Sequence, residues 1–497
     1  MGRPAFEMPF YRNLSNELYK GIVLYRPLTG NHIAEEQFRE IARLCAGYIE
    51  DLVSGFGVWD AFRSYCRKNY NQILPFFSES DEEDGCVSGE VNLIDIKFLV
   101  WMGLHTGRKR QHSVYSPYTE LIDIVAKSLY DLLPEIWETA PANDFRAHLI
   151  GKWVKNDDFF SFRELADWLV FSCYLTRVEG LEDKINAAKH GKDSEAWTHS
   201  DRVRAVLTNK LAPFGCHANG IVAEMAANTG NYALASRCQT VNSFGVAFYE
   251  VVGITESTID LKCIARIDGD SPFVDEIKSV DKDSFSSLKE LHPGTRVMAQ
   301  LAQYGESVVL NGVMMVLGDE SDESDTKIKA IAQDRGTPQI TVEQLTLTKD
   351  HWAKIFAKND GSQIFFPKSM RAFMEMQNEG LDAADFSSLD DSANGMTAYV
   401  FENGLTAFGN CPESFKSERN PYYDEAKASR PGMISVLIYE CGLPSECLLE
   451  AAEEGMLSDL CINSSLGKEV GKAVVQDYLP FWINFLSSTT TTRQYDE

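Results

Sequence analysis

Apolar residues in the first part of the chain recur every three or four positions, which is the spacing of α-helices with one buried face. The clearest run extends from Glu35 to Leu52, and Gly55 and Gly57 follow it as stop signals. The run from Leu93 to Leu104 is apolar almost all round, so we expect a central, buried helix there. Residues 1–215 are therefore predicted to form an all-helical domain.

Polar residues predict where several helices begin. Asn92 is expected to cap the buried helix by accepting a hydrogen bond from the backbone near Asp95. Ser161 and Glu164 have the spacing of a capping box, which predicts a helix start at Ser161. Asn420 before a proline predicts another start, because asparagine caps well and proline tolerates the first turn.

Near Gly245 the spacing changes to alternation of apolar and polar residues, which is typical of strands. The predicted strands are Val246–Val252, Thr258–Ile267, Glu276–Val280, Thr295–Leu301 and Ser307–Leu317. Short antiparallel strands packed so closely along the sequence predict a small β-barrel of the SH3-like or OB-like kind over residues 244–318. Gly312 is available for the bend or bulge that closing such a barrel needs.

Residues 326–497 mix the helical and the strand spacing. Helices are predicted around Asp350–Ala357 and Lys368–Gln377, from Ser445, and in a last segment kinked at Pro480, and strands are predicted near Met396–Val400 and Leu405–Phe408. The predicted fold class is therefore multidomain α+β, with an N-terminal all-α domain, a central small antiparallel β-barrel and a C-terminal α+β region.

The chain is strongly acidic, since 47 Lys and Arg against 73 Asp and Glu give a formal net charge of −26. Such a field repels polyanions, and phosphate contacts need clustered basic residues, so nucleic acid is not expected as a partner. The predicted barrel is acidic as well, because residues 245–317 contain 11 acidic and 6 basic side chains. This balance favours a peptide or protein partner over RNA.

The 11 cysteines are scattered, without the dense spacing of a disulfide framework, and we expect mostly reduced thiols. Residues Met1 to Tyr25 carry charges among their apolar positions and do not resemble a signal peptide. No apolar run approaches the length of a membrane span. The sequence therefore predicts a cytoplasmic protein without a membrane segment.

Two glycine patterns are candidates for nucleotide-binding sites. Gly55 and Gly57 resemble the beginning of a dinucleotide fingerprint, but Asp60 stands where the third glycine is required and a helix precedes the motif. The pairs at Gly467 and Gly471 lack the other residues of a phosphate-binding loop. No cofactor is predicted, and the first two glycines are expected to form a tight corner between helices.

No zinc or calcium motif is present, and no metal is predicted. The local pairings of metal-binding residue types are Cys216 with His217, His199 with Asp201, and Cys441 with Cys447. A zinc site needs three or four converging ligands, which isolated pairs do not supply.

No nucleophile elbow is present, and no catalytic residue is assigned. Neighbouring carboxylates raise one another's pKa when they are buried together. The candidate pairs are Glu50 with Asp51, Asp157 with Asp158, and Glu164 with Asp167. In so acidic a chain, the expected setting of such pairs is a solvated helix end.

The strongest positive cluster is formed by Arg108, Lys109 and Arg110, directly after the predicted buried helix. Cations at a helix C-terminus interact favourably with the negative end of the helix dipole, which is their expected role. The functional alternative is a contact with an anion or an acidic partner.

Four blocks rich in Trp, Phe, Leu and capping residues stand out, and they are Tyr48–Phe62, Glu90–Trp101, Trp137–Pro141 and Phe160–Phe171. They resemble a bacterial family from gut anaerobes that is known only as domain of unknown function 3843. Asn420–Tyr423 and the run Leu448–Gly467 extend the resemblance towards the C-terminus. The resemblance implies common ancestry, and it carries neither an activity nor site residues.

The predicted function is that of a non-catalytic cytoplasmic interaction protein, in which the barrel or the groove beside it takes a protein segment. One alternative is a hydrolase-like enzyme whose site is assembled from distant segments. A second is an RNA- or ribosome-associated factor that uses Arg108, Arg110 and exposed barrel aromatics such as Phe248 or Tyr249.

Overall fold

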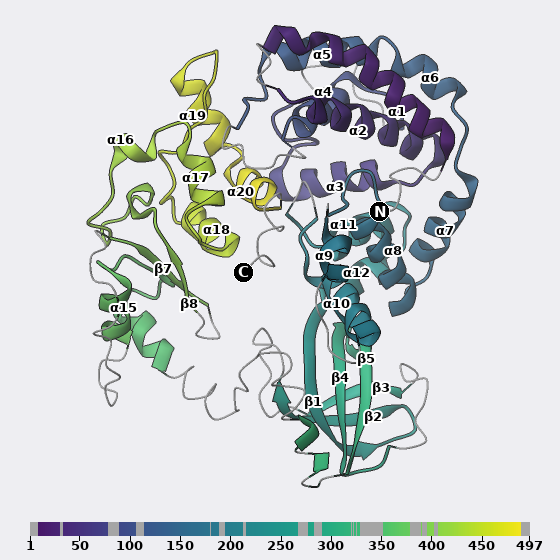
Figure 1. Ribbon diagram of the computed structural model, residues 1–497, viewed down its shortest axis with the longest axis vertical. Coiled ribbons are helices and arrows are strands. Elements are labelled where there is room, and N and C mark those ends of the chain that lie inside the picture. The colour runs from purple at the N-terminus through teal and green to yellow at the C-terminus, as the bar shows by residue number, and fades with distance from the viewer. Residues whose placement is uncertain are drawn as a thin grey trace.

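The structure is a computed structural model, and it describes residues 8–29, 33–77, 89–105, 114–178, 180–187, 194–211, 215–266, 277–282, 291–319, 321, 323–324, 326–328, 351–377, 389, 395–401 and 406–488. Helices fill the first half of the chain, long strands form a sheet at one end, and a second group of helices with a small sheet follows (Figure 1). The mixed content of helices and strands and the helical N-terminal region agree with the prediction.

The N-terminal region is built from short and medium helices. They are α1 (Pro9–Ile22), the 3-10 helix η1 (Val23–Thr29), α2 (Glu35–Ser54), α3 (Val58–Tyr70), α4 (Leu93–Gly103), α5 (Glu120–Tyr130), α6 (Leu133–Thr139), α7 (Asp144–Lys155), α8 (Phe159–Phe171), α9 (Leu181–Ala187), α10 (Ser194–Thr208), α11 (Ala218–Asn228) and α12 (Tyr232–Gln239). The last two follow residue 215, so helices continue almost to the first strand.

A glycine corner joins α2 to α3. Gly55 and Gly57 have φ angles of 66° and 75°, in the left-handed region that side chains with a Cβ rarely adopt. Gly55 ends α2 and donates its N–H to Asp51 O at 2.8 Å, and Gly57 immediately precedes α3. The corner turns the chain so that both helices contribute to one core, as the glycine spacing predicts.

Three of the predicted caps are wrong. Asn92 does not cap α4, because its amide donates to Glu90 O at 2.9 Å and faces Asp95 Oδ2 at 3.3 Å. Helix α8 begins before Ser161, since the Asp158 side chain accepts the Ser161 N–H at 2.9 Å. No helix starts at Asn420, whose amide donates to Pro412 O and Phe415 O at 2.7 Å each and fixes a turn. In each case another polar partner competes for the expected capping group.

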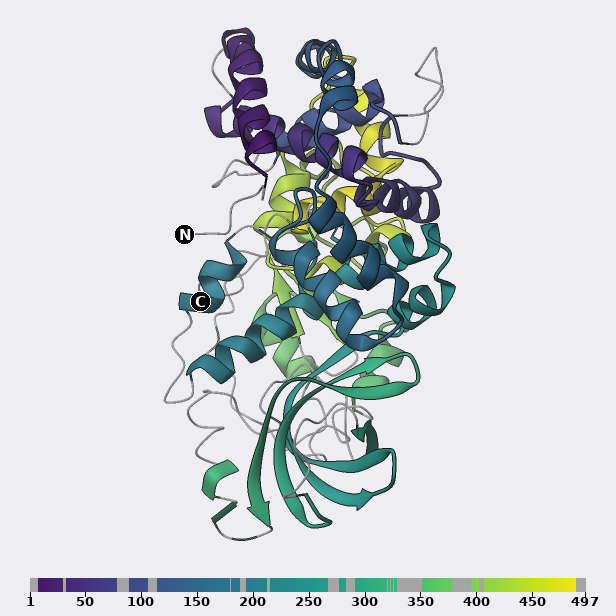
Figure 2. The same cartoon turned by 90° about the vertical axis from the view of Figure 1, so that its right-hand side faces the viewer.

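Five strands pair in a closed ring. They are β1 (Asn242–Ile254), β2 (Thr258–Arg266), β3 (Ile277–Asp281), β4 (Thr295–Tyr304) and β5 (Ser307–Asp319). β1 pairs with both β2 and β4, and β5 lies between β4 and β3. Figure 2 shows how the long strands curve around the ring. The β3–β5 contact is parallel, where the sequence predicted antiparallel neighbours, because β4 lies between β5 and β1 and not beside β3.

The two faces of the ring are buried in different ways. Apolar side chains on the inner face form a core of their own, which contains Phe244, Ala247, Tyr249, Val251, Ile259, Leu261, Cys263, Val280, Leu291, Val297, Ala299, Leu301 and Val308. On the outer face, Phe248 and Met298 pack with Trp197 of α10. Gly312 lies where the pairing of β4 and β5 shifts, with a φ of 139°, as expected for a bend.

The C-terminal region consists of β6 (Ile364–Phe365), α15 (Met370–Gln377), β7 (Thr397–Val400), β8 (Thr406–Gly409), η4 (Pro412–Ser414), α16 (Glu425–Ala428), α17 (Met433–Tyr439), α18 (Ser445–Glu453), α19 (Lys468–Gln476) and α20 (Leu479–Ser488). The predicted kink at Pro480 is instead a break between α19 and α20. Pro480 occupies the first turn of α20, where the missing N–H has no intrahelical partner to lose.

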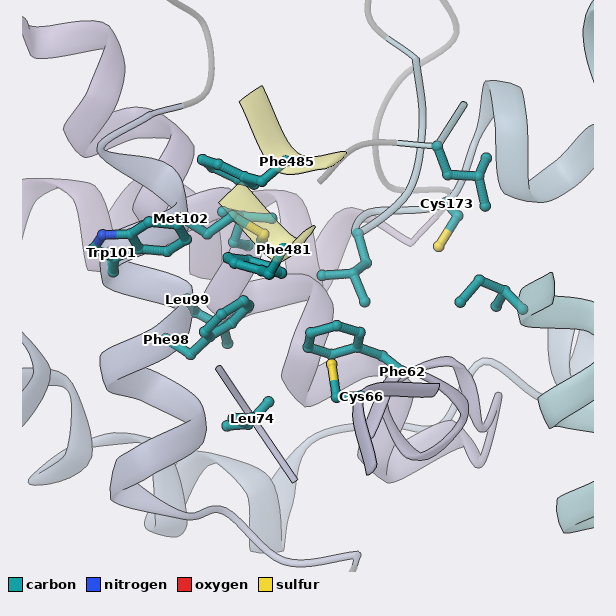
Figure 3. Packing of buried hydrophobic residues seen from close by; sticks show 14 of the residues in the cluster. Phe62, Cys66, Leu74, Phe98, Leu99, Trp101, Met102, Cys173, Phe481 and Phe485 are labelled. Carbon is teal, nitrogen blue, oxygen red and sulfur yellow. The ribbon is translucent and has the colours of Figure 1, made fainter. Parts of the chain in front are cut away.

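Helix α20 inserts into the core of the N-terminal helices (Figure 3). The Phe485 ring lies 4.7 Å from the Trp101 ring, and the Phe481 ring lies 6.2 Å from that of Phe98. All four side chains are buried. The two ends of the described chain therefore share one hydrophobic core, which the sequence spacing did not predict.

Candidate functional site

The predicted basic cluster, Arg108, Lys109 and Arg110, lies outside the described residues. His105, just before it, is buried. The His105 Nδ1 lies 2.8 Å from Trp101 O, and its Nε2 accepts the Tyr115 N–H at 3.0 Å. Since a carbonyl only accepts and an N–H only donates, the ring is neutral with its proton on Nδ1. His105 thereby closes the end of α4.

The carboxylates of Glu50 and Asp51 are only 6% and 2% exposed, so the expectation of a solvated helix end is wrong for this pair. Burial raises the pKa of Glu50 to about 7 and that of Asp51 to about 6. Asp51 accepts hydrogen bonds from the Trp59 N–H at 2.8 Å and the Tyr174 hydroxyl at 3.1 Å, and Glu50 accepts the Asn143 amide at 2.9 Å. The pair ties α2 to three neighbouring segments.

Asp95 is a further buried carboxylate in this core. It accepts the Tyr48 hydroxyl at 2.7 Å and faces the Arg63 guanidinium at 3.7 Å. Burial raises the pKa of Asp95, and the charge of Arg63 opposes that shift. Sequence reasoning missed this contact, although an aspartate inside an apolar helix is an available signal. The buried carboxylates hold helices together, and their surroundings leave them little exposed surface for a substrate.

The remaining carboxylate pairs serve helix ends and surface ion pairs. Asp158 caps α8, and Asp157 lies 3.3 Å from the Arg237 guanidinium. Asp167 accepts two hydrogen bonds from Arg202, each of 2.9 Å. These contacts are ordinary helix caps and surface ion pairs, as expected in a strongly acidic chain.

The candidate metal pairs stay separate in space. His199 and Asp201 lie on α10, and Cys216 and His217 directly precede α11. Within the described ranges, no three His, Cys, Asp or Glu side chains converge in a way that could hold a metal ion. The same ranges contain no helix that is both long and apolar enough to cross a membrane.

A polar contact of Lys210 joins two further segments that are distant in the sequence. The Lys210 ammonium contacts the Ser445 hydroxyl at the start of α18 and lies 3.3 Å from the Glu446 carboxylate. A serine beside a lysine is a nucleophile and its base in some hydrolases. Here Lys210 is ion-paired with Glu446, and an ammonium held by a carboxylate does not accept a proton. The contact therefore fastens α18 to the helical region.

The barrel aromatics are not exposed, so that part of the RNA alternative is wrong. Phe248 is fully buried and Tyr249 is 3% exposed. Phe248 lies under α10, and Tyr249 points into the ring core, because neighbouring residues of a strand face opposite sides. Neither ring can stack on a base.

Part of the outer face of β1, β2 and β3, beyond the area that α10 covers, faces solvent. Glu250, Lys262 and Ile277 form one row across these strands, since Glu250 pairs with Lys262 and Lys262 with Ile277. Ile277 is 58% exposed. In the next row, the Ser279 hydroxyl donates to Asp260 at 2.6 Å. This face is mixed, with acidic, basic and apolar side chains close together.

Strand β5 has one paired side and one open side. It pairs with β4 from Ser307 to Asp319, but on its other side Val308 alone has a strand partner among the described residues. We call the remainder, Val309–Asp319, the free edge of β5. Met314 and Met315 are half-buried along it, and Val316 is 38% exposed. The carbonyls of Leu317 and Asp319 at its end accept hydrogen bonds from the side chains of Lys327 and Ser321. The free edge therefore combines a backbone without a second strand partner among the described residues with apolar, adaptable side chains.

The helical region packs against the turn that joins β4 to β5. The Tyr304 hydroxyl donates to Asp157 O at 2.9 Å, and the Gly305 N–H donates to Thr240 Oγ1 at 2.7 Å. The Tyr304 ring packs on the rings of Phe159 and Phe162. From this anchored turn, β5 runs towards the far end of the ring (Figure 1), and α10 packs against its outer face at Gly312, Val313 and Leu317.

A family model described as "Protein of unknown function (DUF3843)" matches residues 4–237. The match contains the four N-terminal blocks and confirms their resemblance to that family. It ends before β1, so the barrel and the two C-terminal blocks lie outside it. No curated protein and no solved structure matches the chain. Residues 4–237, the helical region that anchors the barrel, are thus similar to the DUF3843 family.

Proposed function

We propose that this chain is a non-catalytic interaction protein whose ring of strands binds an extended segment of another protein along the free edge of β5. The observation that supports the proposal is that, among the described residues, the stretch Val309–Asp319 has a strand partner on its β4 side only. Unpaired N–H and C=O groups on a strand edge accept a further strand, and side-chain pockets beside the edge then select the sequence.

The charge of the ring favours a basic segment. Residues 245–317 contain 11 acidic and 6 basic side chains. Glu250 and Asp260 lie on the outer face, and Asp319 ends the free edge. Opposite charge on a partner accelerates its approach and disfavours acidic competitors. The expected ligand is therefore an extended peptide with alternating apolar residues and a net positive charge.

We also infer that the ring is a small barrel of the OB-like kind. The strand order β1-β2-β3-β5-β4, with a parallel β3–β5 contact, suits a five-stranded Greek-key barrel. Such barrels frequently bind oligonucleotides over β2 and β3. In this chain β2 and β3 contain no aromatic residue on which bases could stack, which supports a protein ligand over RNA.

The test is selection of peptides by display on the full-length protein. Selected peptides are synthesised, labelled, and titrated against the wild type and two variants by fluorescence anisotropy. Val316→Lys places a charge on the free edge, and we expect it to weaken binding by about tenfold or more. Val252→Lys is the matched control, because Val252 is 37% exposed against 38% for Val316 but lies on β1, away from the free edge.

A second readout tests the backbone directly. Methylating alternate backbone nitrogens of a selected peptide removes the donors that a strand needs, so binding should be lost while the side chains remain. Equal affinity of the two lysine variants, or full binding by the methylated peptide, would rule out the free edge as the binding site.

A further inference from the structure

Two glycines hold the end of β8 against the loop that follows α17. A Cβ at Gly409 would lie 2.5 Å from Leu443 Cγ, and one at Gly442 would lie 2.8 Å from Phe408 O. Gly442 also has a φ of 85°, which favours glycine. These residues therefore allow an approach that side chains would block.

The backbones of the two segments are hydrogen-bonded at this point. The Asn410 N–H donates to Cys441 O at 3.0 Å. Cys411, the next residue after Asn410, is thereby placed beside Cys441, whose thiol donates a hydrogen bond to Leu437 O at 2.7 Å. The sequence had paired Cys441 with Cys447, which is fully buried.

The two thiols differ in exposure and in pKa. Cys411 is 7% exposed and Cys441 1% exposed, so a small reagent reaches Cys411 first. The neighbouring Cys441 thiol lowers the pKa of Cys411, against the opposing effects of burial and of the nearby Glu413 and Glu440. A thiolate is the reactive form of cysteine, so Cys411 is the nucleophile of the pair.

We propose that Cys411 and Cys441 are a modification site at which a peroxide forms a reversible disulfide. The Cys411 sulfur attacks one oxygen of hydrogen peroxide, the O–O bond breaks, and a sulfenic acid and one water result. The Cys441 sulfur then displaces the sulfenic hydroxyl, which leaves as a second water after taking up a proton. Two thiols and one peroxide thus give one disulfide and two waters. The bond closes a loop from residue 411 to residue 441 and fixes β8 to α17.

The test treats the reduced full-length protein with a small excess of hydrogen peroxide, alkylates the remaining thiols, and maps disulfides by mass spectrometry of proteolytic peptides. We expect a cross-linked peptide pair containing Cys411 and Cys441, which disappears on reduction. In Cys441→Ala the reaction should stop at the sulfenic acid of Cys411, which dimedone traps, and alkylation of Cys411 should slow because the neighbouring thiol that lowers its pKa is lost.

Cys447→Ala is the matched control, since Cys447 lies in the same region and is as buried as Cys441. It should leave the cross-link intact. The proposal is wrong if peroxide oxidises other cysteines of the wild type while Cys411 and Cys441 remain alkylatable. A dominant disulfide between Cys441 and Cys447 would refute it equally. Both of these outcomes are measured on the wild-type chain, so they test the proposal even if a variant does not fold.

Discussion

The helical core and the barrel differ in where their polar and apolar groups lie. In the helical core, Asp51 and Asp95 are buried and hydrogen-bonded, and large aromatic rings fill the space between helices. In the barrel, the free edge of β5 has no second strand partner among the described residues, and Val316 lies at the surface. The comparison indicates that the buried polar groups of the helical core are used in holding helices together, whereas the proposed binding edge lies on the barrel.

The largest effect is expected where α20 enters the helical core. Phe481→Ala removes a fully buried ring that packs with Phe98 and Phe485, and we expect the free energy of unfolding to fall by about 3–5 kcal/mol. Chemical denaturation of the full-length chain measures it. Phe145→Ala, at a position 69% exposed, should change stability by less than about 0.5 kcal/mol. A small loss for Phe481→Ala would mean that the two ends of the chain do not share a core.

The next effect concerns pH and the buried Glu50. Its pKa in the folded protein is about 7 against 4.5 for an ordinary glutamate, so between these values the folded state binds more protons than the unfolded state. Its contribution to stability is therefore complete below about pH 4.5 and is lost as the pH rises to about 7. The loss is on the order of 3 kcal/mol.

Glu50→Gln tests this dependence, because an amide oxygen can still accept the Asn143 amide without ionising. Denaturation curves from pH 4.5 to pH 8 should fall less steeply for the variant than for the wild type, and the variant should be the more stable protein at pH 8. Parallel curves for the two proteins would show that Glu50 titrates as it does in water.

A smaller effect is expected where the ring meets α10. A Cβ at Gly312 would lie 2.4 Å from Gln300 Oε1 and 2.8 Å from Val203 Cγ2, whereas one at Gly318 would meet nothing within 4 Å. Both glycines have positive φ angles, of 139° and 103°. Gly312→Ala should therefore lower the free energy of unfolding by about 1–3 kcal/mol more than Gly318→Ala does. Equal losses would mean that α10 does not pack closely on the ring.

The smallest effect on stability is expected at the surface of the ring. Val316→Lys and Val252→Lys each change a side chain that is more than a third exposed, so each should shift the free energy of unfolding by no more than about 0.5 kcal/mol. Thermal denaturation checks this. A large loss for Val316→Lys alone would mean that the free edge is part of the barrel's own packing and not a surface for a partner.

Periodicity predicted much of the fold because it reports which face of an element is buried. The helix from Glu35 and the alternating strands of the ring follow directly from it. Spacing does not report which distant elements meet. It could therefore predict neither the insertion of Phe481 beside Phe98 nor the parallel contact of Val280 with Val308.

The candidate sites were harder to predict for the same reason. From the sequence alone, a carboxylate pair such as Glu50 and Asp51 is predicted to be solvated. Its burial depends on tertiary packing, that is, on which segments cover it. The contact of Cys411 with Cys441 depends on two glycines that allow the backbones to approach, and sequence distance conceals it. Exposure of Phe248 failed as a prediction because α10 covers the outer face of β1.

Hydrogen exchange of the full-length protein with and without a selected basic peptide tests the central claim most directly. The peptide should protect backbone amides on the free edge, Val309–Asp319, while those of β1 keep their exchange rates, because β1 is already paired on both sides. Unchanged exchange along the free edge in the presence of bound peptide, with protection elsewhere, would contradict the account.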